Sequence, residues 1–120
     1  MTRRRGQHNQ TPRYDRMARV NELCREILAE ELERIDDERL TLVTITHVGV
    51  DKALDKGVVE FSALGEDEDE ALEALLEHRV RLQGAIGRQA RLKRTPELRF
   101  ELDTLIATGA RIEELLRDDE

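Results

Sequence analysis

Apolar residues recur at helical spacing along the first third of the chain, and they predict a long helix that runs to about Ile35. Thr11 followed by Pro12 is typical of an N-cap and a first helical residue, because proline there loses a donor that would be unpaired anyway. The expected buried stripe consists of Val20, Cys24, Ile27, Leu28, Leu32 and Ile35. On this stripe Cys24 is interpreted as a small buried apolar residue rather than a reactive thiol.

The period of the pattern then changes from helical to alternating, which is typical of strands. Residues 40–51 are rich in β-branched side chains, and they place Thr44, Val48 and other even positions on one face, with Ile45 and His47 on the other. A turn is expected at 52–57, and a second strand at 58–64 has Val59, Phe61 and Ala63 on one face. The short connection predicts an antiparallel hairpin.

An acidic run at 66–70 opens the next predicted helix. Carboxylates in a first helical turn complement the positive end of the helix dipole, so this run needs no metal-binding explanation. The expected buried face consists of Ala71, Leu72, Leu75, Leu76 and Val80. The helix continues, with or without a break, into a basic stretch that Pro96 ends.

Two further elements complete the pattern. Residues 97–103 alternate, with Leu98, Phe100 and Leu102 expected to face inward, and they predict a third strand. Residues 105–116 predict a last helix, whose apolar side consists of Ile112, Leu115 and Leu116. The sequence therefore predicts one α+β domain at 12–117, preceded by a flexible basic arm at 1–11 and followed by an acidic tail at 118–120.

The basic stretch at 82–103 carries the candidate chemistry, because it combines a G-x-x-G pair with arginines. On a helix, Gly84 would share a face with Arg81, Arg88 and Arg91, and a glycine there leaves backbone that a phosphate can approach. A solvated helix with two tolerated glycines is the alternative that the sequence leaves open. The predicted RNA-binding residues are Arg79, Arg81, Gly84, Gly87, Arg88, Arg91, Lys93 and Arg94.

Charge is segregated along the chain although the net charge is −7. Residues 1–19 hold six arginines and one aspartate, 78–99 hold seven basic residues and one glutamate, and 65–77 hold seven acids and no base. A polyanion responds to such local potential rather than to the average. The additional candidate RNA contacts are Arg3, Arg4, Arg5, Arg13 and Arg16, although the three arginines of the arm could equally serve solubility.

Composition excludes several classes of protein. Tyr14, Phe61 and Phe100 are the only aromatic residues, which argues against folds that stack bases on exposed rings. One cysteine allows no internal disulfide, and no apolar run could span a membrane, so a cytoplasmic protein is expected. No cofactor or metal is expected, because His47 has no second ligand at metal-binding spacing. No activity is expected either, because the sequence contains neither a nucleophile paired with a base nor a phosphate-binding loop.

Short motifs in a fixed order make the chain similar to the ribosome-binding factor A family across residues 13–117. They are Arg19-Val20, Ile35-x-Asp37-x-Arg39-Leu40, Val43-Thr44-Ile45-Thr46, Gly87, Leu92, Pro96-Glu97-Leu98-x-Phe100-x-x-Asp103 and Gly109-x-Arg111-Ile112-x-x-Leu115-Leu116. The order of elements, α-β-β-α-α-β-α, resembles the type II KH architecture. In that fold a three-stranded sheet is covered on one face by helices, and RNA lies over the junction of the two central helices.

The resemblance implies a non-catalytic assembly factor that binds the small (30S) ribosomal subunit near the decoding region and the 5′ end of its rRNA. It would assist late maturation and 5′-end processing of 16S rRNA as a monomer, with assembly GTPases as further candidate partners. A protein-interaction module, docking through the long first helix or the acidic helix start, and a general KH-type RNA-binding protein are the alternatives.

The chain departs from the family pattern at two places. The family typically has Ala-x-Gly at the kink between the central helices, where this chain has His78-Arg79-Val80, and Glu38 stands where proline is common. A literal G-x-x-G occurs at 84–87, so the sequence leaves both segments open as the position of the kink.

Overall fold

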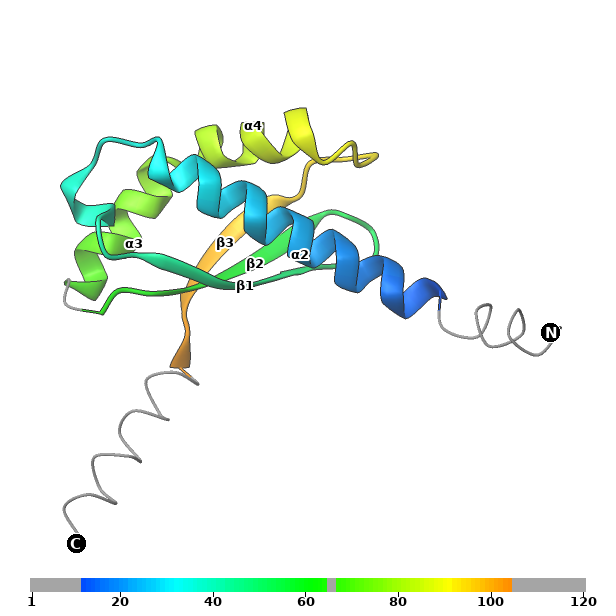
Figure 1. The fold of residues 1–120 in the computed structure, drawn as a ribbon, viewed down its shortest axis with the longest axis horizontal. Helices are drawn as coiled ribbons and strands as arrows, with labels where there is room; N and C mark the ends of the chain where they lie inside the picture. The colour runs from blue at the N-terminus through cyan, green and yellow to red at the C-terminus, as the bar shows by residue number, and fades with distance from the viewer. Residues whose placement is uncertain (1–11, 65–66, 105–120) are drawn as a thin grey trace, which may run out of the picture.

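The computed structural model describes residues 12–64 and 67–104, which form one sheet and its helices (Figure 1). The predicted arm, the last predicted helix and the acidic tail lie outside these residues. The elements in chain order are α2 (Pro12–Glu33), the 3₁₀ turn η1 (Glu38–Leu40), β1 (Thr44–Val50), β2 (Lys56–Ser62), α3 (Glu68–Glu77), α4 (Arg79–Gln89) and β3 (Glu97–Leu102).

The sheet has the strand order β1-β2-β3, with β2 in the centre. β1 and β2 pair antiparallel, which confirms the predicted hairpin, and β2 and β3 pair parallel across the connection through α3 and α4. Both hairpin strands differ from their predicted bounds. The first begins at Thr44 rather than residue 40, because η1 occupies 38–40, and the second spans 56–62 rather than 58–64.

Three helices pack on one face of the sheet. On β2 and β3 the buried positions alternate as predicted, with Val59, Phe61 and Leu98 among the most buried residues of the chain. In the described part of the chain no element covers the other face, which we call the open face. α2 and α4 lie side by side above the sheet and run in opposite directions (Figure 1).

The predicted alternation of β1 is wrong at one point. The register with β2 shifts between Ile45 and His47, so one extra residue is inserted into the strand. A bulge of this kind exchanges the two faces of a strand, and Ile45 and Val48 are therefore both buried although the alternation put them on opposite faces. His47 is exposed.

The core consists mainly of aliphatic side chains from all layers, together with Phe61 and Phe100 from the sheet. The predicted stripe of α2 is confirmed, since every one of its members from Cys24 to Ile35 is buried. Burial raises the pKa of the Cys24 thiol, which keeps it protonated and fits a packing role. None of the helices among residues 12–64 and 67–104 has the length and apolar character needed to cross a membrane.

The predicted buried face of the α3 segment is only partly correct. Ala71 and Leu75 are buried, whereas Leu76 is 49% exposed and Val80 is 77% exposed. The prediction left a break in this helix open but placed Val80 on the same apolar stripe as Leu75. The chain breaks at His78, so Val80 belongs to a second helix and is exposed on it.

Candidate nucleic-acid interface

The junction of α3 and α4 lies at His78. This residue ends α3 and begins α4 with φ −97° and ψ 10°, outside helical geometry. Its N–H donates to the carbonyl of Ala74 at 3.1 Å, and its own carbonyl accepts from Leu82 N at 3.0 Å. The break therefore falls at 78–80, while Gly84 and Gly87 lie inside the continuous helix α4.

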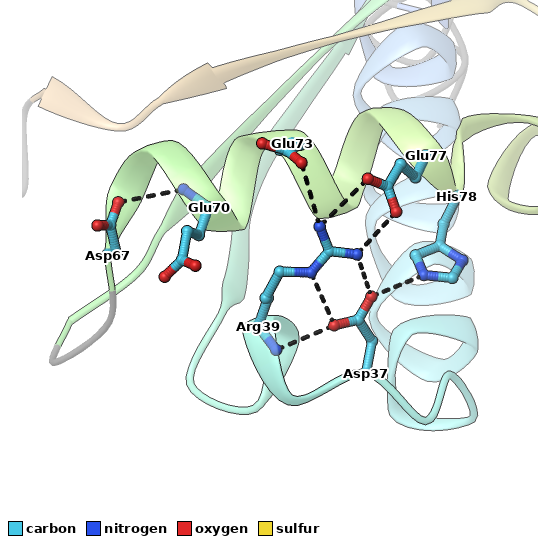
Figure 2. Close-up of polar contacts among 7 residues, drawn as sticks. All are labelled: Asp37, Arg39, Asp67, Glu70, Glu73, Glu77 and His78. Atoms are coloured by element: carbon cyan, nitrogen blue, oxygen red, sulfur yellow. Dashed lines mark hydrogen bonds and ion pairs between the residues drawn. The ribbon is translucent and has the colours of Figure 1, made fainter.

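A network of hydrogen bonds ties this junction to the turn after α2 (Figure 2). Asp37 caps η1, and its Oδ1 accepts from the backbone N–H of Arg39 at 3.0 Å. Its Oδ2 accepts from Arg39 Nη2 at 2.8 Å and lies 3.0 Å from His78 Nε2. The other side of Arg39 is bound by Glu77, whose Oε1 accepts from Nη2 at 2.7 Å.

These contacts keep the Asp37 carboxylate charged. Hydrogen bonds from Arg39, and then from His78, hold the pKa of Asp37 well below its usual range. Three elements meet at one carboxylate, so the angle at the junction is set before any ligand arrives. The sequence marked Asp37 and Arg39 only as part of a family motif, and nothing in their spacing predicts a contact with residues 77 and 78.

Arg81 was predicted to contact RNA, but its guanidinium already has an internal partner. Its Nε donates to Glu31 Oε2 at 2.7 Å, and the Glu31 side chain is only 6% exposed. Arg34 reaches the other oxygen of this carboxylate at 3.4 Å. Arg81 first of all holds α4 against α2, and together with Arg34 it keeps the pKa of Glu31 below its ordinary value.

Arg94 is also paired, though weakly. Its Nη1 forms an ion pair with Asp55 in the hairpin turn, and both side chains are more than half exposed. An exposed pair of this kind contributes about 0 to 1 kcal/mol, so a phosphate can displace Asp55 at little cost.

Four of the predicted residues have side chains without an internal partner among residues 12–64 and 67–104. Arg79 is half-buried beside the junction, and the other three are exposed. We call this set the α4 cations: Arg79, Arg88, Arg91 and Lys93.

The predicted helical face of Arg81, Gly84, Arg88 and Arg91 is wrong at Arg91, which lies beyond the end of α4. α4 ends at Gln89, seven positions before the proline that was expected to stop it. Arg91 has φ 55°, a left-handed conformation that terminates helices. Arg91 and Lys93 therefore project from the loop that follows α4, while Arg79 and Arg88 lie on the helix itself.

Side-chain atoms cover the backbone at both glycines of α4, although the sequence analysis predicted that a phosphate could approach the backbone there. A Cβ on Gly84 would lie 3.2 Å from Nη1 of Arg88, whose side chain folds back over this position. A Cβ on Gly87 would lie 2.9 Å from Oγ1 of Thr95, so the loop before β3 packs against that turn. A phosphate approaching Gly84 would therefore meet the Arg88 guanidinium before it met the backbone.

The structure adds apolar surface that the sequence did not predict at this site. Leu76 and Val80, both exposed, are four positions apart across the junction and flank Arg79 in sequence. Gln83 fixes the far side of α4, because its Oε1 accepts from the N–H of Leu98 at the start of β3.

The remaining predicted residues lie on or beyond α2. Arg16 is exposed on this helix and Arg13 lies in its first turn, whereas the three arginines of the arm, Arg3, Arg4 and Arg5, are outside the described residues. The described residues contain no group of three His, Cys, Asp or Glu side chains that could hold a metal ion.

Comparison with known proteins identifies the family. The sequence model described as ribosome-binding factor A matches residues 16–116. The chain belongs to the ribosome-binding factor A family. A relative named ribosome-binding factor A from Rubrobacter xylanophilus is 41% identical over 105 residues, which are 86% of each chain.

Solved structures of this family share the fold. The crystal structure of ribosome-binding factor A from Thermus thermophilus has a TM-score of 0.69 at 32% identity, over 72% of this chain and 94% of that one. Coordinates of a homology model of the Thermus thermophilus ribosome-binding factor A, fitted into the cryo-EM map of a 30S complex of this factor, have a TM-score of 0.58 at 34% identity. They cover 67% of this chain and 87% of theirs. The predicted α+β, KH-like fold is thereby confirmed.

Proposed function

We propose that this protein binds the small ribosomal subunit and assists late maturation, including 5′-end processing, of its 16S rRNA without catalysing a reaction. Membership of the ribosome-binding factor A family and the 30S complex of the Thermus thermophilus relative support the choice of partner. Assembly GTPases are candidate partners in this proposal, a monomer in the cytoplasm is the expected state, and the arginines of the arm and of α2 are secondary contacts.

The single observation that carries the RNA-binding part is the set of α4 cations, which begins at the junction that Asp37 and Arg39 tie to η1 and continues along α4 into the following loop. No side chain caps the N-terminus of α4, so a phosphate at the junction would meet Arg79 together with the positive end of the helix dipole. The α4 cations would bind further phosphates along the helix and its following loop.

The same surface favours recognition of shape over recognition of bases. Phe61 is 1% exposed and Phe100 is 8% exposed, so neither ring can stack on an unpaired base. Tyr14 belongs to α2, and its side chain lies outside the described ones. Contacts to phosphates position a protein on RNA without reading its sequence, which suits a factor that must leave once maturation is complete.

Co-sedimentation with purified small and large subunits tests the proposal. Four phosphate contacts predict that log affinity falls with log salt with a slope of roughly −3. The double variant Arg88→Glu with Arg91→Glu should weaken binding to the small subunit by at least ~10-fold, since it removes two contacts and adds two repulsions. The circular dichroism spectrum should not change.

The matched control changes the same charge on the open face. Lys56 and Arg99 are exposed there, and replacing both by glutamate should weaken binding less than about threefold through the long-range field. Equal losses for the two double variants, or equal binding to both subunits, would show that the α4 cations are not the interface.

A further inference from the structure

A groove lies on the flank of α2 that is opposite α4. It has a volume of about 510 Å³ and separates the C-terminal half of α2 from the edge of β1 and the turn before it. Arg25, Ala29 and Glu33 face it from the helix at steps of four, whereas Glu31 faces α4. We call this the α2–β1 groove.

The groove is lined by aliphatic side chains and by carboxylates. Ala29 and Val43 are half-buried on opposite walls, above the buried side chain of Leu32. The rim carries Glu33, Asp36 and Glu38, all exposed and none with an ion pair in the described part of the chain.

Positive charge in the groove is already neutralised. Arg25 is the only cation among the lining residues, and Glu22 holds it through two hydrogen bonds, one from Nε at 3.0 Å and one from Nη2 at 2.6 Å. Asp37, which also reaches the groove, is occupied by Arg39. The free charge at the rim is therefore negative, and it repels nucleic acid.

The edge of β1 limits how a ligand could bind. The outward N–H of Val50 is taken by Asn21 Oδ1 at 2.9 Å, and the bulge between Ile45 and His47 interrupts the edge further along. Caps and bulges of this kind oppose addition of a strand. A ligand would thus have to bind mainly through side chains that enter the groove.

We propose that the α2–β1 groove binds a basic, extended peptide segment of a partner protein. An aliphatic side chain of the segment packs between Ala29 and Val43, and lysine or arginine side chains on either side reach the carboxylates of the rim. Charge complementarity decides for a basic protein segment over RNA. The proposal concerns a different surface from the α4 cations and does not depend on them.

Amide NMR of the full chain, titrated with an eight-residue peptide of alternating lysine and valine, tests this. The amides of Ala29, Glu33 and Val43 should shift, and the glutamate–valine counterpart should leave them unchanged. The variant Glu33→Lys with Glu38→Lys should weaken the lysine peptide about tenfold or more, because two attractions become repulsions.

Two variants separate the groove from general charge effects. Glu97→Lys with Glu101→Lys makes the same charge change on the exposed side of β3 and should cost less than about threefold. Ala29→Leu fills the groove without changing charge and should also weaken the peptide. Equal losses for both charge variants, shifts that map to α3 instead, or the same shifts with an RNA oligomer would overturn the proposal. Subunit binding through Arg88 and Arg91 is measured separately, so either proposal can fail alone.

Discussion

Truncation of Arg81 should destabilise the fold, whereas truncation of Arg88, also a cation on α4, should not. The Arg81 guanidinium lies 2.7 Å from a Glu31 carboxylate whose side chain is 6% exposed. Alanine at position 81 leaves that carboxylate in place with only Arg34, at 3.4 Å, as a partner. Arg88 has no such internal partner in the described residues.

The expected cost follows from the burial of the two partners. Removing one member of a fully buried ion pair costs about 3 to 5 kcal/mol, because the other charge stays desolvated. The Arg81 side chain is 44% exposed, and water that enters after truncation screens Glu31, so we reduce the figure to about 1 to 3 kcal/mol. For a domain of this size that corresponds to a fall in melting temperature of roughly 5 to 15 °C.

Urea unfolding followed by circular dichroism measures both variants. Arg88→Ala should lie within about 0.5 kcal/mol of the parent, as exposed substitutions usually do. In a background of Glu31→Gln, which removes the charge, Arg81→Ala should cost distinctly less than in the parent. Equal costs for Arg81→Ala and Arg88→Ala, or strict additivity of Arg81→Ala and Glu31→Gln, would refute the assignment of Arg81 as a clamp between α2 and α4.

Four further predictions rest on the Glu31 carboxylate, the two glycines of α4 and the Asp37 carboxylate. The folded-state pKa of Glu31 lies below its ordinary value of 4.5, so the stability that its charge contributes is present above pH 4.5 and is lost as the pH falls through the folded value. In urea unfolding, the free energy of unfolding should therefore fall less between pH 7 and pH 4 for Glu31→Gln than for the parent. Gly84→Ala should stabilise the chain by up to about 1 kcal/mol in thermal unfolding, because only a movable arginine tip opposes the Cβ. Gly87→Ala should raise the stability less, because its Cβ would lie 2.9 Å from Oγ1 of Thr95. Combining it with Thr95→Ala removes this contact and should restore the gain. Asp37→Ala should speed amide hydrogen exchange at the start of α4 and weaken subunit binding while α2 keeps its protection, and unchanged exchange there would contradict the role given to this carboxylate.

The layers of this fold could be predicted because their signals are local. The stripe of α2 and the alternation of β2 and β3 each put apolar side chains at one period, and the structure buries Leu28, Val59 and Leu98 as expected. The hairpin followed from a short turn between two such runs. The position of the bulge did not, because the alternation of β-branched residues continues through Thr46 without a glycine or proline to mark it.

The candidate site was harder to predict because its contacts join distant segments. Glu31 is one of several glutamates on α2, and nothing near it indicates that Arg81, fifty residues later, is its partner. The end of α4 has no local signal either. Arg91 adopts a positive φ without being glycine or asparagine, so Pro96 was the only stop visible in the sequence.

The cations that can bind RNA are those that the fold does not use in its own ion pairs. Arg39 and Arg81 are held by carboxylates near the α3–α4 junction and the C-terminal end of α2, where Arg39 ties the junction to η1 and Arg81 ties α4 to α2. Neither can turn to a phosphate without exposing a charge that the fold has already paired. The α4 cations have no ion-pair partner among the described residues. Among the described residues, Arg39 and Arg81 thus hold the frame whereas the α4 cations are presented by it, and substitutions of Arg39 or Arg81 should change stability before they change affinity.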